Sequence, residues 1–217
     1  CMVVCGDGDG ASTGNTRRFG ASLDKIKQVV KPRPGEIMFG LNLVVYKGKT
    51  IFVGDTSVHE YPSSEQLAEI AISAARVVRL FGFDPKVAFV SHSTFGQPVT
   101  NRTKHIKDAV EILKKKNVNF EFDGDMQPDV ALSEEYKSLY PFSKIVGNAN
   151  ILIMPGQHSA AISYKMMKTL GDTKVIGPLL IGLGLPIEIA PLRSSTSEIL
   201  NLASIAAYSA DVIDYKK

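Results

Sequence analysis

Short apolar runs alternate with amphipathic stretches along most of this chain, and that alternation restricts the fold more than any other feature. The predicted strands lie at 86–91, 119–125, 150–155 and around 176–180. The predicted helices lie at 63–82, about 103–116, 132–139, 158–171 and about 197–213. Strands separated by helices of this length favour βαβ units. The sequence therefore predicts an α/β fold, a three-layer αβα arrangement around a mostly parallel sheet.

Two further strand-like runs, 37–46 and 50–55, precede this alternation and read as a hairpin that turns at Gly48. The chain opens with an apolar run at 1–5, predicted as a strand, and a glycine-rich loop follows it. A strand, a glycine loop and a helix begin a dinucleotide site, because glycines let backbone amides approach a pyrophosphate. Here the spacing from Gly8 is GxGxxxG, one residue longer than the fingerprint, and Asp7 and Asp9 would repel the anion. A dinucleotide site is therefore disfavoured.

The charge and the cysteines limit the partners that we expect. A formal net charge of +3 over 217 residues is too small to indicate nucleic acid. Cys1 and Cys5 are the only cysteines and have no CxxC spacing, so we expect neither a disulfide nor a zinc site, in a reducing cytoplasm. The longest apolar stretch, 177–192, contains three prolines and Glu188, so we expect no membrane span.

Ligands of parallel α/β sheets bind beyond the carboxyl ends of the strands, so polar residues at those ends are the candidate site residues. They are Ser91, His92, Ser93, Thr94 and Gly96 after the first strand of the alternation, Asp123, Gly124, Asp125 and Gln127 after the second, and Gly156, Gln157, His158 and Ser159 after the third.

These strand ends resemble the phosphate acetyl/butyryl transferase family. The matching blocks, in order, are DTSVHEYPSSEQLAEIA, SHSTFG, FEFDGDMQPDVAL, NILIMPGQHSAAISYKM and GPLLIGLGLPIEI, and they span nearly the whole chain. More narrowly, GDGDGxxTGxTRR, SHSTFG and QHSA resemble the version of this domain that is fused behind the catalytic part of bacterial NADP-dependent malic enzymes.

The resemblance implies an isocitrate/isopropylmalate dehydrogenase-like phosphate acyltransferase fold of two subdomains, with CoA and phosphate in the cleft between them. The family begins upstream of residue 1, so we expect 1–35 to be a remnant of the first subdomain. We expect 36–190 to form the second subdomain and 191–217 a C-terminal helix that returns to the first. The resemblance further implies acetyl-CoA or another acyl-CoA as ligand, no covalently bound cofactor, no metal in this domain, and a homodimer or higher homo-oligomer. It also implies a malic enzyme catalytic domain in the same polypeptide.

By this resemblance, the candidate phosphate-binding residues are Ser91, Ser93, Thr94 and Gly96, which match the family's Ser-Thr-Gly block. Their hydroxyls and amides can bind phosphate oxygens, or they can form a polar turn that caps the next helix. Asp129 matches a family aspartate and can equally be the N-cap of the helix after it.

Thr16, Arg17 and Arg18 follow the opening loop and can face the cleft, where guanidinium groups suit CoA phosphates, or they can be surface residues at a helix start. The family's Ser-Arg pair, with the serine near the reacting thiol and the arginine on the phosphate, falls on Pro191 and Leu192, neither of which can replace it. Arg193 lies one position late. Glu198 stands at the family's aspartate and also completes a capping box from Ser195.

These residues leave three hypotheses for function. The first is a regulatory domain of a malic enzyme that binds acyl-CoA and has lost its own transfer reaction. The second is an active phosphate acyltransferase in which Arg193, Arg17 or Arg18 supplies the missing cation. The third is a dimerisation scaffold without catalysis.

Overall fold

The structure, a computed structural model, describes residues 2–98 and 103–213 and contains two sheets. Six strands form the larger sheet in the order β5-β4-β6-β3-β2-β7. Their bounds are β2 Phe39–Tyr46, β3 Lys49–Gly54, β4 Lys86–Val90, β5 Glu121–Met126, β6 Ile151–Ile153 and β7 Thr173–Ile181. The strands from β5 to β3 are parallel, and β2 is antiparallel to both of its neighbours. The mostly parallel α/β arrangement is confirmed.

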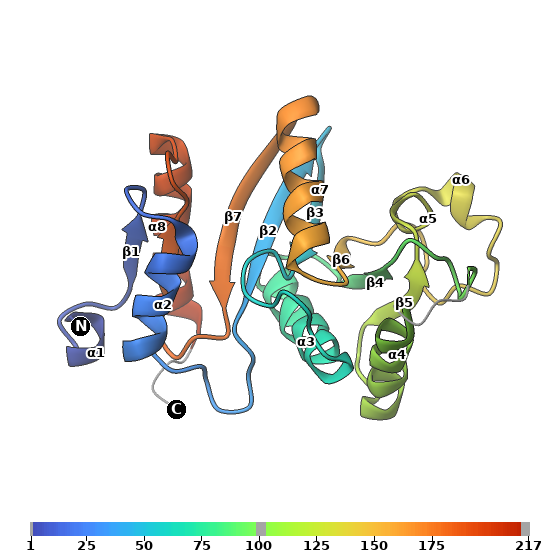
Figure 1. Cartoon of the computed structure of the whole chain (residues 1–217), viewed down its shortest axis with the longest axis horizontal. Helices are drawn as coiled ribbons and strands as arrows, with labels where there is room; N and C mark the ends of the chain where they lie inside the picture. The colour runs from blue at the N-terminus through green and yellow to red at the C-terminus, as the bar shows by residue number, and fades with distance from the viewer. Residues whose placement is uncertain (1, 99–102, 214–217) are drawn as a thin grey trace.

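Helices cover both faces of this sheet (Figure 1). α3 (Ser64–Leu80) and α4 (Lys104–Lys116) pack on one face around Phe39, Phe52 and Phe89. α5 (Pro128–Leu132) and α7 (Gln157–Leu170) pack on the other around Val44, Val53 and Leu152. The result is the three-layer αβα arrangement predicted from the alternation.

β1 (Ala11–Gly14) and β8 (Ile187–Ala190) form a separate parallel pair, which α2 (Phe19–Val29) and α8 (Thr196–Val212) flank (Figure 1). β1 and β8 approach so closely that a Cβ on Gly14 would lie 2.2 Å from Ala190 O. This glycine is therefore needed for strand packing. The change from one sheet to the other falls between β7 and β8, ahead of the boundary expected at 190, and the domain division itself stays a prediction.

The strand predicted at 1–5 is wrong. Residues Met2–Cys5 form a short exposed helix, α1, and Cys1 lies outside the described residues. No described strand lies beside this segment, so its backbone N–H and C=O groups pair within the segment instead of in a ladder. Cys5 is a free, exposed thiol.

Local signals in the sequence predict the β2–β3 hairpin and the starts of two helices correctly, but not the helix after β5. The hairpin between β2 and β3 turns at Lys47 and Gly48, both with positive φ. Capping boxes begin α3 at Ser63 and α8 at Ser195, as the sequence predicts. The helix expected near 132–139 is instead split, because α5 ends at Leu132 and the single turn α6 covers Glu134–Lys137.

Candidate functional site

The loop after β4 is held by hydrogen bonds of its own hydroxyl and amide groups. Asp125, which is fully buried at the end of β5, accepts from Ser93 Oγ and from Gly96 N at 3.1 Å. Thr94 Oγ1 accepts from Gln127 N at 3.2 Å. Ser91 Oγ lies 3.1 Å from Ser93 Oγ. These contacts support the polar-turn interpretation for Ser93 and Thr94, whose side chains are buried inside the loop.

A pocket of about 830 Å³ lies beside this loop, at the carboxyl ends of β4 and β6. Ser91 is the one member of the predicted Ser-Thr-Gly block that lines it. The other polar lining residues are Glu60, Tyr61, His92, Thr103, His105, His158 and Ser159. The chain has four histidines, and three of them face this one pocket.

The N-terminus of α7 opens into the same pocket. Among the described residues, the backbone N–H groups of His158 and Ser159 have no hydrogen-bond acceptor, as expected for the first turn of a helix. The Ser159 hydroxyl donates to Gly156 O at 2.8 Å. The start of this helix therefore offers an anion two free amide donors and the positive end of the helix dipole.

A buried aspartate positions the wall of the pocket that contacts the start of α7. Asp55, at the end of β3, accepts from the backbone of Gly40, Ser57, Val58 and His59, and its Oδ2 lies 2.7 Å from His59 Nδ1. Gln157 N then donates to His59 O at 3.0 Å, which seats α7 on this turn. A Cβ on Gly156 would lie 2.4 Å from Glu60 O, so the approach requires glycine. The DTSVHEYP motif was visible in the sequence, but its role as a pocket wall was not predicted.

A second group of predicted residues gathers at the carboxyl ends of β1 and β8. Asn15 N donates to Ala190 O at 2.9 Å, and Arg193 N donates to Asn15 O at 3.3 Å, so the two loops are joined. Arg17, Arg18 and Arg193 are exposed, and none of their guanidinium groups has a hydrogen-bond or ion-pair partner among the described residues. Thr16 and Arg17 border a pocket of about 690 Å³.

The segment from Pro191 to Glu198 lies beside these arginines. Leu192 is 53% exposed, and Pro191 O accepts from both the backbone and the hydroxyl of Ser194, at 3.2 and 2.9 Å. Glu198 accepts from Ser195 N at 2.8 Å and from Lys168 Nζ at 2.6 Å, and these contacts lower the pKa of its carboxyl. Glu198 therefore caps α8 and ties it to α7.

The predicted residues thus lie in two places. The pocket beside β4 and the pocket beside β1 have no lining residue in common. Asp129 belongs to neither pocket lining. It is exposed in the first turn of α5, where its Oδ1 accepts from Val130 N at 2.9 Å, and the N-cap is Gln127.

In the part of the chain that the structure describes, no three His, Cys, Asp or Glu side chains are arranged to hold a metal ion. No helix within 2–98 or 103–213 has the length and apolar character needed to cross a membrane.

Comparison with known proteins identifies close relatives of this domain. The family profile described as "Phosphate acetyl/butaryl transferase" matches residues 1–207. The chain is 44% identical over 209 residues to the NADP-dependent malic enzyme of Rhizobium meliloti, a match that covers 96% of this chain and 28% of that enzyme. It is 30% identical to the phosphate acetyltransferase of Bacillus subtilis, across 96% of this chain and 65% of that protein.

A solved structure has the same fold. The phosphotransacetylase from Streptococcus pyogenes superposes with a TM-score of 0.90 at 30% identity, over 97% of this chain and 65% of that one. The chain therefore spans a little over a quarter of the malic enzyme and about two thirds of the transferases.

Proposed function

The chain belongs to the phosphate acetyl/butyryl transferase family, and from that premise we propose that it is an acyl-CoA-binding regulatory domain of an NADP-dependent malic enzyme. In this role, acyl-CoA binds a former active site and shifts the equilibrium of an attached catalytic domain, while the domain's own acyl transfer is lost. The other proposed partners are phosphate and a second copy of the chain. No covalent cofactor and no metal are part of the proposal, and the proposed location is the cytoplasm.

The observation that favours ligand binding is that the guanidinium groups of Arg17, Arg18 and Arg193 have no partner within residues 2–98 and 103–213. Guanidinium groups bind phosphate oxygens in pairs of parallel hydrogen bonds, so this place suits the phosphates of CoA. We place the anionic part of the ligand here and not at Ser93, because the Asp125 carboxylate already occupies that hydroxyl. An anion at Ser93 would meet a buried negative charge.

The observation that opposes catalysis lies in the same loop. Acyl transfer from phosphate to CoA requires the reacting groups to be held in contact and the charge on the leaving phosphate to be stabilised. Pro191 and Leu192 provide neither a side-chain donor nor a cation. Arg193 favours the second candidate, an active acyltransferase. It follows Leu192 directly, and among the described residues its guanidinium group has no partner, so it can supply the missing cation.

Calorimetry with acetyl-CoA tests the proposal, using a polypeptide in which this chain is extended upstream to the length of the transferase relatives. We expect binding, and a stabilisation of about 2.7 kcal/mol at a hundredfold excess over the dissociation constant. Arg17→Ala and Arg193→Ala should weaken binding, by roughly 1.5 to 3 kcal/mol for each lost charge-assisted bond. Arg79→Ala is the matched control, because the Arg79 guanidinium lies on α3 and binds Asn119, which follows α4.

Two results would contradict the proposal. If acetyl-CoA does not bind, the scaffold hypothesis replaces it. If binding is intact in the Arg17 and Arg193 variants and is weakened by Ser91→Ala, the ligand occupies the pocket beside β4 instead.

A further inference from the structure

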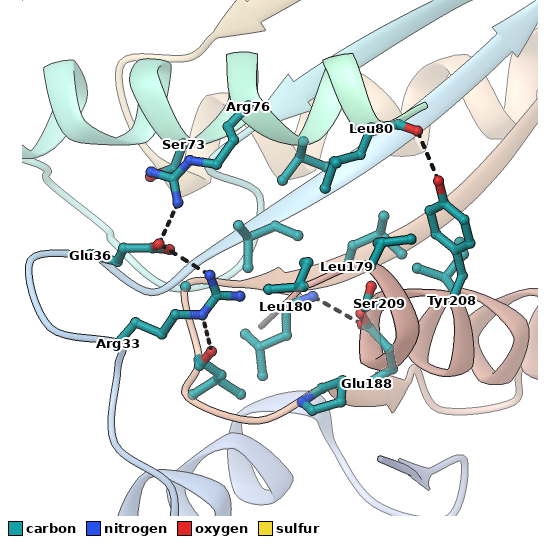
Figure 2. A pocket seen from close by; sticks show the side chains of 18 of the residues that line it. Arg33, Glu36, Ser73, Arg76, Leu80, Leu179, Leu180, Glu188, Tyr208 and Ser209 are labelled. Carbon is teal, nitrogen blue, oxygen red and sulfur yellow. Dashed lines mark hydrogen bonds and ion pairs between the residues drawn. The ribbon is translucent and has the colours of Figure 1, made fainter. Parts of the chain in front are cut away.

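A third cavity, of about 250 Å³, lies between α3, β7, β8 and α8 (Figure 2). It has no lining residue in common with either of the two pockets described above. Apolar side chains form most of its wall, among them Val77, Leu80, Leu179 and Ile205. Pockets for drug-sized ligands measure roughly 300 to 1,000 Å³, so this cavity suits a smaller molecule.

Glu188 is the unusual residue in this cavity. It is 4% exposed, and its Oε2 accepts from Leu180 N at 3.0 Å. Among the described residues its Oε1 has no partner, although Glu188 lines the cavity. Burial raises the pKa of this carboxyl to about 8, so near neutral pH it is mainly protonated. With Oε2 accepting from the backbone, the proton is free to be donated from Oε1 into the cavity.

Two arginines stand at the other side of the cavity. Arg33 and Arg76 both bind Oε1 of Glu36, the first at 3.3 Å (Figure 2). Arg76 contacts Glu36 through Nη1, and among the described residues its Nε and Nη2 have no partner, so these donors can bind a ligand anion. Half of the Arg76 side chain is exposed, so its guanidinium group can reach a ligand at the entrance without breaking a buried contact.

From this arrangement we propose that the cavity binds a small monocarboxylate with an apolar body and a carbonyl oxygen at its far end. Arg76 holds the carboxylate at the entrance, and Glu188 donates a hydrogen bond to the carbonyl oxygen. The chain of the ligand lies against the apolar wall, where its burial from water favours binding.

The charges around the cavity exclude other ligand classes. An amine would have to pass Arg33 and Arg76, and it would have to ionise Glu188 in an apolar site. A dicarboxylate would place its second charge beside that buried carboxyl. The remaining titratable groups in the lining are Glu36 and Tyr208, whose hydroxyl donates to Leu80 O at 3.2 Å.

The probe for this site is 4-oxopentanoate, with pentanoate as the matched control that lacks the carbonyl group. Binding is followed by calorimetry and by saturation-transfer NMR on the chain at pH 6.5. We expect 4-oxopentanoate to bind about tenfold or more tightly than pentanoate, the ratio given by one hydrogen bond of about 1.4 kcal/mol. Arg76→Gln should weaken binding, and Arg79→Gln, one position outside the cavity lining, should not.

Glu188→Gln and Glu188→Leu complete the test. The glutamine amide still donates a hydrogen bond and cannot ionise. The Glu188→Gln protein should therefore bind 4-oxopentanoate with equal affinity at pH 6.5 and pH 9.5, whereas the unaltered protein should lose affinity at the higher pH. Glu188→Leu should lose the preference for 4-oxopentanoate, and circular dichroism checks that it is folded. If it is not, the pH comparison between the unaltered protein and Glu188→Gln decides alone. The proposal is overturned if neither probe binds, if the two probes bind equally, or if the Glu188→Gln affinity changes with pH as that of the unaltered protein does.

Discussion

Ser93 Oγ donates a hydrogen bond to the fully buried carboxylate of Asp125 and thereby joins the loop after β4 to the end of β5. This contact determines what the SHSTFG motif does in this chain. A hydroxyl that already binds a carboxylate is not available to a phosphate, and the negative charge beside it repels one. Ser91 and His92 are the members of the motif that line the pocket and can meet a ligand.

Asp125→Ala should destabilise the fold by about 3 kcal/mol, because it leaves the Ser93 hydroxyl and the Gly96 N–H without their acceptor. Asp129→Ala is the control, since that carboxylate is exposed and binds only the neighbouring Val130 N; we expect it to cost less than about 1 kcal/mol. Urea unfolding followed by circular dichroism measures both. Equal effects of the two substitutions would show that the loop does not depend on Asp125.

The chain supplied with acetyl phosphate and CoA should form no more acetyl-CoA than a heat-killed sample, because Pro191 and Leu192 cannot stabilise the leaving phosphate. The measurement is the thioester absorbance over time. Turnover of about 1 per second or more, the ordinary enzymatic range, would support the active acyltransferase instead. Arg193→Ala would then show whether that arginine supplies the cation.

The stability of the fold should decrease between about pH 4.5 and pH 8 because of Glu188. Burial raises the pKa of this carboxyl from 4.5 to about 8 in the folded chain, so across this range the folded state holds a proton that the unfolded state has released. The contribution of protonated Glu188 to the free energy of unfolding is present in full below pH 4.5. It is lost as the pH rises to 8, and the total loss is about 5 kcal/mol. Glu188→Gln should remove it.

The measurement is the free energy of unfolding in urea at pH 5.5, 7 and 8.5 for both proteins. Other titrating groups contribute equally to the two, so the difference between the curves isolates Glu188. Parallel curves would mean that Glu188 titrates normally in the folded chain.

The chain should be at least a dimer in solution, and we place the contact on the outer face of α7. Ile162, Met166 and Leu170 stand four residues apart along this helix and are 57%, 54% and 80% exposed. Such a stripe on a helix surface is a candidate for burial against a second copy. Met166→Lys should produce monomers in sedimentation at tens of micromolar, well above the dissociation constant of a stable dimer.

Leu139→Lys, an equally exposed apolar residue after α6, is the control and should leave the association unchanged. A monomeric unaltered chain would remove the proposal of a dimer. A dimer that withstands Met166→Lys would move the contact to another face.

Local signals in the sequence predict much of the fold, because a capping box or a turn glycine acts on neighbouring residues. Ser63 and Ser195 cap the helices that they were expected to cap. β8 was missed because all four of its residues are buried, so it shows no alternation inside an apolar stretch.

The candidate site was harder to predict for the same physical reason. The partner of Ser93 lies 32 residues away, and no local pattern indicates that a carboxylate will occupy its hydroxyl. The cavity at Glu188 is likewise formed by α3, β7 and α8, which are distant in sequence. The resemblance to the family identified the motifs, but the tertiary contacts determine which of their side chains can meet a ligand.

The pairing of β1 with β8 has a consequence for synthesis. Ala11 is in register with Ile187, so about 175 residues separate the two strands. At elongation rates of about 5 to 20 residues per second, a ribosome needs roughly ten to forty seconds to make the segment between them. During this time β1 lacks β8, its partner among the described strands, while β2 to β7 lie between the two in sequence and can pair first. The pairing of β1 with β8 is therefore expected to form after the pairings among β2 to β7 during translation.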